Sequence, residues 1–183
     1  YRGADMAQKP TFDYDIIIIG SGAGGSPAAS MAARAGKKVA IIEQDEFGGE
    51  SPNRGEVPLG AMLNVANTYD SAKKAADFGL RTAAVGYKYP SILPWRDTVV
   101  KRTGAAGNRR YYEKQSISTF NGTAHFLSPN EISINRRHLS ARKFLIATGT
   151  TWEIPDIPGI TETPYFTPKD ILTLTRPPKT LFI

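Results

Sequence analysis

The chain contains no cysteine among its 183 residues. Disulfide bonds, thiolate metal sites and cysteine nucleophiles are therefore excluded. The only two histidines, His125 and His138, lack the spacing of a metal-binding pair, so we predict no metal site and a packing or surface role for both. No apolar run approaches the roughly 20 residues of a membrane-spanning helix, and the first residues do not resemble a signal peptide. These absences favour a cytoplasmic protein without a membrane partner.

The chain also has no long run of one charge, although 23 Lys and Arg against 17 Asp and Glu give a formal net charge of +6. The densest basic pairs are Lys37-Lys38, Lys73-Lys74, Arg109-Arg110 and Arg136-Arg137. A nucleic-acid-binding face usually gathers such residues in one patch. Solvated surface positions are therefore favoured and no nucleic-acid partner is expected, with nucleic-acid binding as the less favoured alternative. Tyr111-Tyr112, beside one basic pair, is read as a half-buried packing pair.

The most informative segment that is present runs from Asp15 to Glu43. A run of four isoleucines ends in the pattern Gly-x-Gly-x-x-Gly, formed by Gly20, Gly22 and Gly25 with Ala23 and Gly24 between the last two. A helix of small residues is predicted over 23–35, followed by a second apolar strand over 38–43 that ends in Glu43 and is followed by Gln44. This order of elements is that of a βαβ unit that binds an adenine dinucleotide.

Each residue of this fingerprint has a predicted role. Gly20 allows the tight turn out of the strand, Gly22 lets a pyrophosphate approach the backbone, and Gly25 lets the helix pack closely on the sheet. Glu43 lies 18 positions after Gly25, a spacing suited to accepting hydrogen bonds from a ribose, which favours FAD or NAD over NADP. A glycine-rich turn with a purely structural use is the less favoured alternative.

The whole pattern predicts an α/β fold, in which a Rossmann-type parallel sheet carries a small antiparallel β-meander around 117–135. The expected strands are 14–19, 38–43, 117–121, 124–127, 131–134 and 144–147, and the expected helices are 23–35, 57–76, 92–115 and 169–174. Residues 44–55 are expected to form a loop, 77–90 a connection with a short strand or turn at 78–80, and 150–168 an irregular, proline-rich segment. Residues 1–12 are expected to be a tail. Residues 1–5, which precede Met6, are compatible with a remnant of an expression vector. Because 180–183 resemble the beginning of a strand, we expect a piece of a longer protein.

Several segments resemble the pyridine nucleotide-disulfide oxidoreductases, a flavoprotein family that includes dihydrolipoamide dehydrogenase, mercuric reductase and glutathione reductase. Residues 48–58, Gly-Gly-Glu-Ser-Pro-Asn-Arg-Gly-Glu-Val-Pro, resemble the redox loop of that family, Gly-Gly-Thr-Cys, four residues, Cys, then Val or Ile, Pro, Ser and Lys. Further similar segments are 75–80, Leu-Ile-Ala-Thr-Gly at 145–149 with the Pro-containing stretch 154–159, and 179–183. The resemblance runs from about residue 13 to the end of the chain.

The resemblance implies FAD at the site between Gly20 and Glu43. It implies that 13–176 are the first, larger part of an FAD-binding domain and that 177–183 begin an NAD(P)-binding domain. The implied cofactor contacts outside the fingerprint are Gly48, Gly49, Glu50 and Ser51 on the flavin side, Gly122, Thr123 and Ala124 near the adenine, and Ala147, Thr148 and Gly149 along the groove. NAD(P)H and a homodimer are implied for the full-length protein.

The departures from the family pattern are equally informative. Ser51 and Glu56 occupy the positions of the two redox cysteines, and Leu59 and Gly60 replace the Ser and Lys. Dithiol–disulfide chemistry is excluded, so no residue of this chain is predicted to be catalytic. We expect a flavin-dependent NAD(P)H oxidoreductase that passes electrons from FAD to a quinone, a dye or oxygen. Two alternatives stay open: an FAD-binding or structural fragment without turnover, and an NAD-dependent dehydrogenase that holds NAD at the first site.

Overall fold

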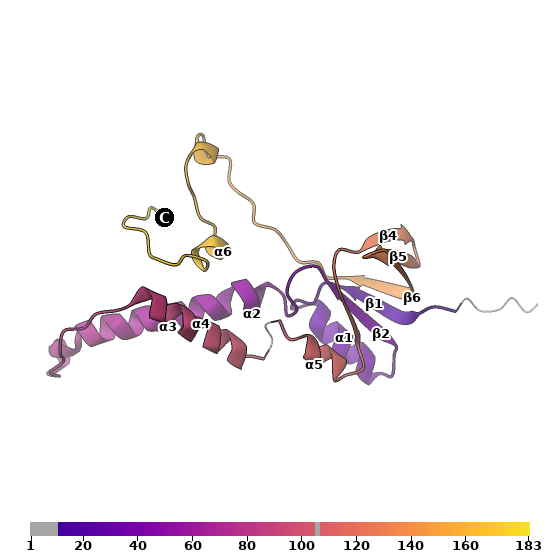
Figure 1. Cartoon of the computed structure of the whole chain (residues 1–183), viewed down its shortest axis with the longest axis horizontal. Coiled ribbons are helices and arrows are strands. Elements are labelled where there is room, and N and C mark those ends of the chain that lie inside the picture. Colours follow the sequence, from indigo (N-terminus) through magenta and orange to yellow (C-terminus); the bar gives the residue numbers. More distant parts are fainter. Residues whose placement is uncertain (1–10, 105–106) are drawn as a thin grey trace, which may run out of the picture. The chain divides into compact units, whose positions relative to one another are not determined.

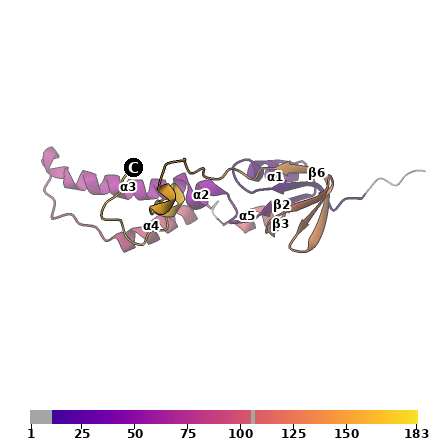
Figure 2. The same cartoon turned by 90° about the horizontal axis from the view of Figure 1, so that it is seen from above.

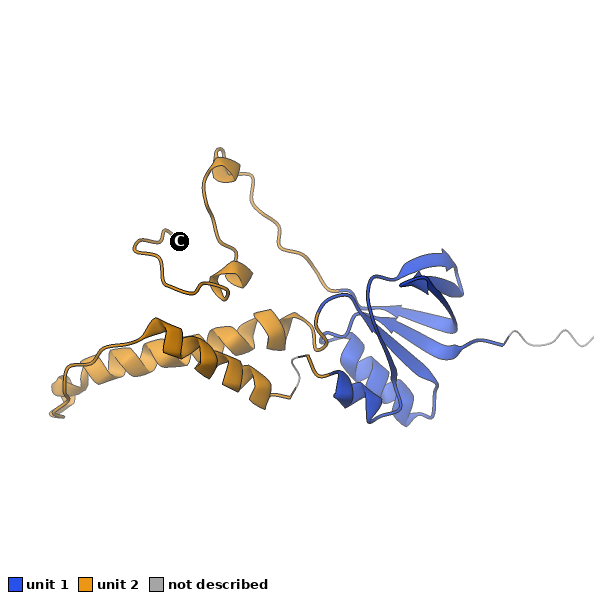
Figure 3. Cartoon of the chain, in the orientation of Figure 1, with its two compact units in different colours: residues 1–45, 109–148 blue, residues 46–108, 149–183 orange. Residues whose placement is uncertain are grey.

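The computed structural model describes residues 11–104 and 107–183. All but the last two residues of the tail predicted over 1–12 therefore lie outside the described residues. The chain divides into two compact units (Figure 3). The described part of unit 1 comprises residues 11–45 and 109–148, and that of unit 2 comprises 46–104, 107–108 and 149–183.

Unit 1 is built on a six-stranded sheet with the strand order β3-β2-β1-β6-β5-β4 (Figure 1). The strands are β1 (Tyr14–Ile19), β2 (Val39–Glu43), β3 (Ser118–Asn121), β4 (His125–Ser128), β5 (Glu131–Ile134) and β6 (Arg137–Ile146). β1 pairs in parallel with β2 and β6, and β2 pairs in parallel with β3. β4, β5 and β6 pair in antiparallel order. The predicted α/β fold, a Rossmann-type parallel sheet with a small antiparallel meander, is confirmed.

Strand β6 is much longer than the strand predicted at 144–147. Its residues up to Ser140 pair with β5, and its residues from Ala141 pair in parallel with β1. The prediction missed residues 137–143 because four exposed polar side chains, Arg137, His138, Arg142 and Lys143, interrupt the apolar pattern. The tight turn from β5 uses two residues with positive φ, Asn135 (47°) and Arg136 (63°), which suits a two-residue hairpin.

The core of unit 1 lies between the parallel strands and the meander. Ile17, Ala40 and Ile42 pack with Ile132, Ile134, Leu139 and Ala141, and all seven are buried. Helix α1 (Gly25–Arg34) follows β1 and begins two residues later than predicted. Four isoleucines in succession form β1 because alternate side chains of a strand point to opposite faces, and in this sheet both faces are covered.

Unit 2 contains the helices α2 (Glu50–Arg54), α3 (Glu56–Lys73), α4 (Tyr89–Arg102) and α6 (Pro168–Ile171), and the 3₁₀ turns η1 (Ala75–Phe78) and η2 (Ile160–Glu162). α3 and α4 run side by side in both views (Figures 1 and 2). The Arg96 guanidinium on α4 donates to the carbonyl oxygen of Leu172, which links the last segment of the unit to this helix pair.

Several predicted elements of this region were wrong. The loop predicted over 44–55 contains the helix α2, and the helix predicted over 57–76 ends at Lys73. Residues 75–78 form the 3₁₀ turn η1, and the turn at Gly79 that follows it agrees with the strand or turn expected at 78–80. The helix predicted over 92–115 is two helices, α4 and the separate α5 (Arg109–Glu113) of unit 1. Gly104 and Gly107 have φ values of +66° and +58°, which end a right-handed helix. The predicted helix 169–174 is shortened to α6, and residues 180–183 form no strand.

Two further observations concern absences within the described part of the chain. No helix between residues 11 and 104 or between 107 and 183 combines the length and apolar character needed to cross a bilayer. Over the same ranges, no group of three or more acidic or histidine side chains is arranged to hold a metal ion. His138 lies on the surface, where its Nδ1 is 2.9 Å from a carboxylate oxygen of Glu131.

Candidate functional site

The glycine-rich loop between β1 and α1 is held in close contact with the backbone around it. Gly20 has a φ of +100°, and a Cβ atom there would lie 2.1 Å from the carbonyl oxygen of Ala147. A Cβ atom on Gly25 would lie 1.9 Å from the carbonyl oxygen of Gly20. Both distances are too short for any side chain, so these two positions have the tight-turn and close-packing geometry that the fingerprint predicts.

The same loop presents backbone donors without acceptors. Within the described residues, the N–H groups of Gly22, Ala23 and Gly24 donate to no protein atom, while Ser26 N donates to Gly22 O over 3.0 Å. Ala23 and Gly24 are exposed. Since these N–H groups precede the positive end of the ten-residue helix α1, the loop fits a diphosphate group.

Glu43, at the end of β2, is connected directly to this loop. Its Oε2 accepts hydrogen bonds from Ser21 N (2.9 Å) and Ser21 Oγ (2.7 Å), and its Oε1 accepts one from Asp45 N (3.0 Å). Glu43 is 9% exposed and Ser21 is fully buried. The structure therefore places the predicted ribose-binding acid beside the glycine-rich loop, as a buried carboxylate at the end of a parallel strand.

Tyr112, which is distant in the sequence, forms a hydrogen bond with the glycine-rich loop. The Tyr112 hydroxyl on α5 donates to the carbonyl oxygen of Ser21 over 3.2 Å, and burial raises the pKa of this hydroxyl above its ordinary value. Tyr111 is 45% exposed and its ring packs edge-on against that of Tyr112, with 5.2 Å between the ring centroids. Tyr111 is therefore half-buried, as predicted, whereas Tyr112 is fully buried. Sequence reasoning missed the roles of Tyr112 and Ser21, because no local pattern connects residues 91 positions apart.

The predicted adenine-side loop 122–124 lies next to the end of β2. Gly122 N donates to Glu43 O over 2.8 Å, and the Asn121 side chain donates to the carbonyl oxygens of Glu43 and Asp45. A Cβ atom on Gly122 would lie 2.8 Å from the side-chain oxygen of Asn135. The φ of +142° at Gly122 disfavours any other residue, independently of any ligand. Asn121 and Asn135 are supporting residues that the sequence did not single out.

The predicted flavin-side residues form a separate cluster in unit 2. Gly48 and Gly49 have φ values of 106° and 80°, and the Asn53 side-chain amide donates to the carbonyl oxygens of Phe47 (3.1 Å) and Gly49 (2.8 Å). Asn53, which had no predicted role, therefore fixes this turn. Glu50 is exposed at the first position of α2.

Ser51 and Glu56, the residues predicted to occupy the two redox-cysteine positions, contact each other. The Ser51 hydroxyl donates to Oε1 of Glu56, and this hydrogen bond holds the pKa of the Glu56 carboxyl below its usual value. Gly55 separates α2 from α3, and a Cβ atom on it would lie 3.0 Å from Ser51 Cα. The glycine thus permits the close approach of the two helices that carry Ser51 and Glu56.

The predicted cofactor-binding residues therefore fall into two groups. Unit 1 brings together the glycine-rich loop, Glu43, the loop at 122–124 and Ala147, with the exposed Gln44, Thr123 and Thr148 at its edge. Unit 2 holds Gly48, Gly49, Glu50 and Ser51, and also the exposed Gly149, where a Cβ atom would meet nothing within 4 Å.

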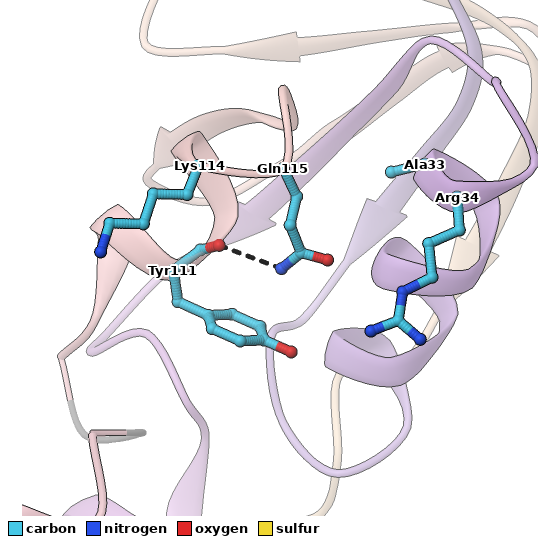
Figure 4. A pocket seen from close by; sticks show the side chains of 5 residues that line it. All are labelled: Ala33, Arg34, Tyr111, Lys114 and Gln115. Carbon is cyan, nitrogen blue, oxygen red and sulfur yellow. Dashed lines mark hydrogen bonds between the residues drawn. The ribbon is translucent and has the colours of Figure 1, made fainter.

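Unit 1 also contains an open pocket of about 400 Å³ lined by Ala33, Arg34, Tyr111, Lys114 and Gln115 (Figure 4). The Gln115 side chain donates to the carbonyl oxygen of Tyr111 over 3.0 Å. Ala33 and Arg34 belong to the last turn of α1, whereas the glycine-rich loop precedes its first turn. The pocket is therefore distinct from the predicted dinucleotide site.

Comparisons with known proteins agree with this geometry. A family model described as pyridine nucleotide-disulphide oxidoreductase matches residues 14–183. A dihydrolipoyl dehydrogenase from Acholeplasma laidlawii is 34% identical over 176 residues, which cover 93% of this chain and 52% of that protein. A glutathione reductase from Burkholderia cepacia is 34% identical over 148 residues, which cover 81% of this chain and 33% of that protein. A mercuric reductase from Staphylococcus aureus is 31% identical over 171 residues, covering 93% and 31% respectively. The chain thus spans about a third to about half of the length of these relatives.

Proposed function

The chain belongs to the pyridine nucleotide-disulphide oxidoreductase family, and from this premise we propose that unit 1 binds the adenosine diphosphate part of FAD. The observation that carries the proposal is the combination of three N–H groups without acceptors at Gly22, Ala23 and Gly24 with a carboxylate at the end of the neighbouring strand. The N–H groups would hold the pyrophosphate, and Glu43 would accept a hydrogen bond from the ribose.

FAD is favoured over NAD at this site by the elements outside the βαβ unit. An NAD-binding domain needs neither the Gly48-Gly49 turn nor the Ala-Thr-Gly segment that begins at Ala147. Ala147 contributes the carbonyl oxygen against which Gly20 packs, so this segment forms part of the loop's support. Tight co-purification of a flavin would rule out the alternative of an NAD-dependent dehydrogenase that uses the first site for NAD.

We further propose that the whole protein is an NAD(P)H-dependent flavoenzyme whose electron acceptor is not a disulfide. Bound FAD would supply the hydride- and electron-transfer chemistry, while the chain binds and orients it. Ser51 and Glu56 cannot cycle between thiol and disulfide states. A small acceptor such as a quinone, a dye or oxygen would be consistent with this loss, because such a molecule takes electrons from flavin directly. FAD binding without turnover is the second candidate, favoured by the same substitution of both redox positions.

The first test is a visible absorption spectrum of the purified chain before and after addition of FAD and desalting. A retained flavin spectrum supports the proposal, and its loss in Glu43→Ala but not in Glu46→Ala assigns the binding to the predicted site. Glu46 is an exposed acid three positions further along the chain and serves as the matched control. A colourless protein that cannot be reconstituted would contradict the proposed FAD site.

The acceptor is then tested in the full-length protein. Oxidation of NADH or NADPH with a quinone, a dye or oxygen, and none with disulfide substrates, is the expected result. Disulfide reductase activity would overturn the proposal. FAD binding with no NAD(P)H oxidation by any acceptor would favour the second candidate.

A further inference from the structure

Asn121 is the one asparagine of the sequence that precedes a glycine, Gly122. In such a pair the backbone nitrogen of the glycine can attack the side-chain carbonyl carbon of the asparagine, because no Cβ atom hinders the approach and glycine adopts most backbone conformations. The bond from that carbon to the side-chain nitrogen then breaks, ammonia leaves, and a cyclic succinimide remains. Water adds to the succinimide and opens it to aspartate or to isoaspartate.

The structure holds both reacting groups of this pair in hydrogen bonds. The Gly122 N–H donates to Glu43 O over 2.8 Å, and the Asn121 side-chain amide donates to Glu43 O (3.1 Å) and Asp45 O (2.8 Å). The Asn135 side-chain amide donates to Asn121 O over 2.7 Å. In the folded chain the attacking nitrogen and the leaving amide are therefore both fixed on carbonyl oxygens at the end of β2.

The pair lies at a place where the sheet can open locally. Asn121 is the exposed last residue of β3, and β3 is the edge strand of the six-stranded sheet, with β2 as its neighbour. The end of an edge strand opens at a lower free energy than the centre of a sheet. Separation of β3 from β2 releases both reacting groups at once, since Glu43 O accepts hydrogen bonds from Gly122 N and from the Asn121 amide.

We propose that Asn121 is a modification site: pairing of β3 with β2 protects it, and it converts to aspartate or isoaspartate from the opened edge. The conversion removes the amide donor, and a carboxylate cannot donate to the carbonyl oxygens of Glu43 and Asp45. Isoaspartate also lengthens the main chain by one side-chain carbon, which shifts the register at the end of β3. The product therefore re-pairs poorly, and the modification records that the edge has opened. No step needs a cofactor, so the inference is independent of the proposed function.

The test is incubation of the purified chain in mildly alkaline buffer, followed by brief digestion and mass spectrometry of the peptide that contains Asn121. Replacement of the amide nitrogen by oxygen changes the mass, and chromatography separates the aspartate product from the isoaspartate product. A synthetic peptide with the sequence of residues 117–126 gives the unprotected rate. We expect conversion in the chain to be at least about tenfold slower than in the peptide, because it follows the population of the opened edge. Isoaspartate should form in both.

Two variants test the protection without changing either reacting residue. Asn135→Gly removes the amide that donates to Asn121 O, and glycine suits the φ of 47° at this position. We expect conversion about fivefold faster than in the natural chain, the effect of losing one neutral hydrogen bond. Asn135→Asp, which keeps the shape of the side chain but not the donor, replaces it should Asn135→Gly not fold. Asn130→Ala is the matched control, because the Asn130 amide donates to Ala141 O on β6, and it should leave the rate unchanged.

Equal rates in the folded chain and in the peptide would overturn the protection by β2. The same follows if removal of the Asn135 donor leaves the rate unchanged, or if Asn130→Ala raises the rate as much, because the opening would then not be local. Aspartate without isoaspartate would mean that Gly122 N is not the attacking atom, and this too would overturn the proposal. None of these results bears on the proposed FAD site, which the absorption spectrum tests separately.

Discussion

The Tyr112 hydroxyl donates a 3.2 Å hydrogen bond to the carbonyl oxygen of Ser21, which ties α5 to the glycine-rich loop across 91 positions of sequence. Tyr112 is 2% exposed, so loss of its hydroxyl would leave a carbonyl acceptor without this donor in a buried environment. We expect Tyr112→Phe to lower the free energy of unfolding of unit 1 by about 1 kcal/mol.

Tyr111→Phe is the matched control for this variant. Tyr111 is 45% exposed and its hydroxyl lies 3.4 Å from Ser30 Oγ, so we expect a change within about 0.5 kcal/mol. Hydrogen exchange of the β1 and β2 amides is the suitable measurement, because both tryptophans, Trp95 and Trp152, lie in unit 2 and their fluorescence does not report on unit 1. Equal effects of the two variants would contradict the assigned hydrogen bond.

Two adjacent glycines of the fingerprint should respond very differently to alanine. In Gly25→Ala the new Cβ would lie 1.9 Å from the backbone oxygen of Gly20, so α1 must shift, and we expect a loss of about 3 kcal/mol or more. In Gly24→Ala the nearest atom is Ala147 Cβ at 3.7 Å and the φ of −88° suits any residue, so stability should stay within about 1 kcal/mol. Urea unfolding followed by circular dichroism measures both. A severe loss in Gly24→Ala would show that the loop geometry is different.

The stability of unit 1 should depend on pH through Asp13. Its Oδ2 accepts hydrogen bonds from Ser140 N and Ser140 Oγ, both at 2.8 Å, and these bonds hold the pKa of Asp13 below the ordinary value of 3.8. Because the pKa is lower in the folded state, the stabilisation is present above pH 3.8 and is lost as the pH falls through the folded pKa.

We therefore expect Asp13→Asn to be less stable than the natural chain at neutral pH and equally stable well below pH 3.8. The difference should be under about 1 kcal/mol, since the carboxylate is exposed and screened by solvent. Asp156→Asn is the control, because in the described part of the chain the Asp156 side chain has no hydrogen-bond partner. Thermal unfolding at a series of pH values measures the difference, and a constant offset between Asp13→Asn and the natural chain at all pH values would contradict the linkage.

The features that the sequence could predict are those encoded over short distances. The isoleucine run, the three glycines and Glu43 lie within one βαβ unit, so their spacing alone predicts the strand, the turn and the position of the acid. The region 92–115 divides into two helices at Gly104 and Gly107, which have positive φ. The helical spacing of apolar residues in the sequence does not show the backbone conformation of these glycines. The first half of β6 was missed because exposed polar side chains, among them Arg137 and His138, leave no apolar run there, although backbone pairing with β5 makes it a strand.

The supporting contacts of the site could not be predicted in the same way. Ser21 occupies a variable position of the fingerprint, and its hydrogen bonds to Glu43 form only when β1 and β2 are in register. Tyr112 looks like a packing residue in the sequence, and only its position in the fold makes it a donor to the loop. Sequence reasoning therefore found the residues expected to meet a ligand and missed those that hold them in place.

The contact between Ser51 and Glu56 gives a prediction that is independent of any cofactor. The Ser51 hydroxyl is the first cause of the lowered pKa of Glu56, so Ser51→Ala should raise that pKa toward its ordinary value of 4.5. The Glu56 carboxyl carbon signal in a carbon-13 NMR titration measures this directly. Ser71→Ala removes an exposed hydroxyl from the same helix as Glu56 and should leave the titration unchanged. An unchanged titration in Ser51→Ala would mean that the two positions are not paired in solution. A raised pKa would show that this chain holds the Ser51 hydroxyl and the ionised Glu56 carboxylate together in solution.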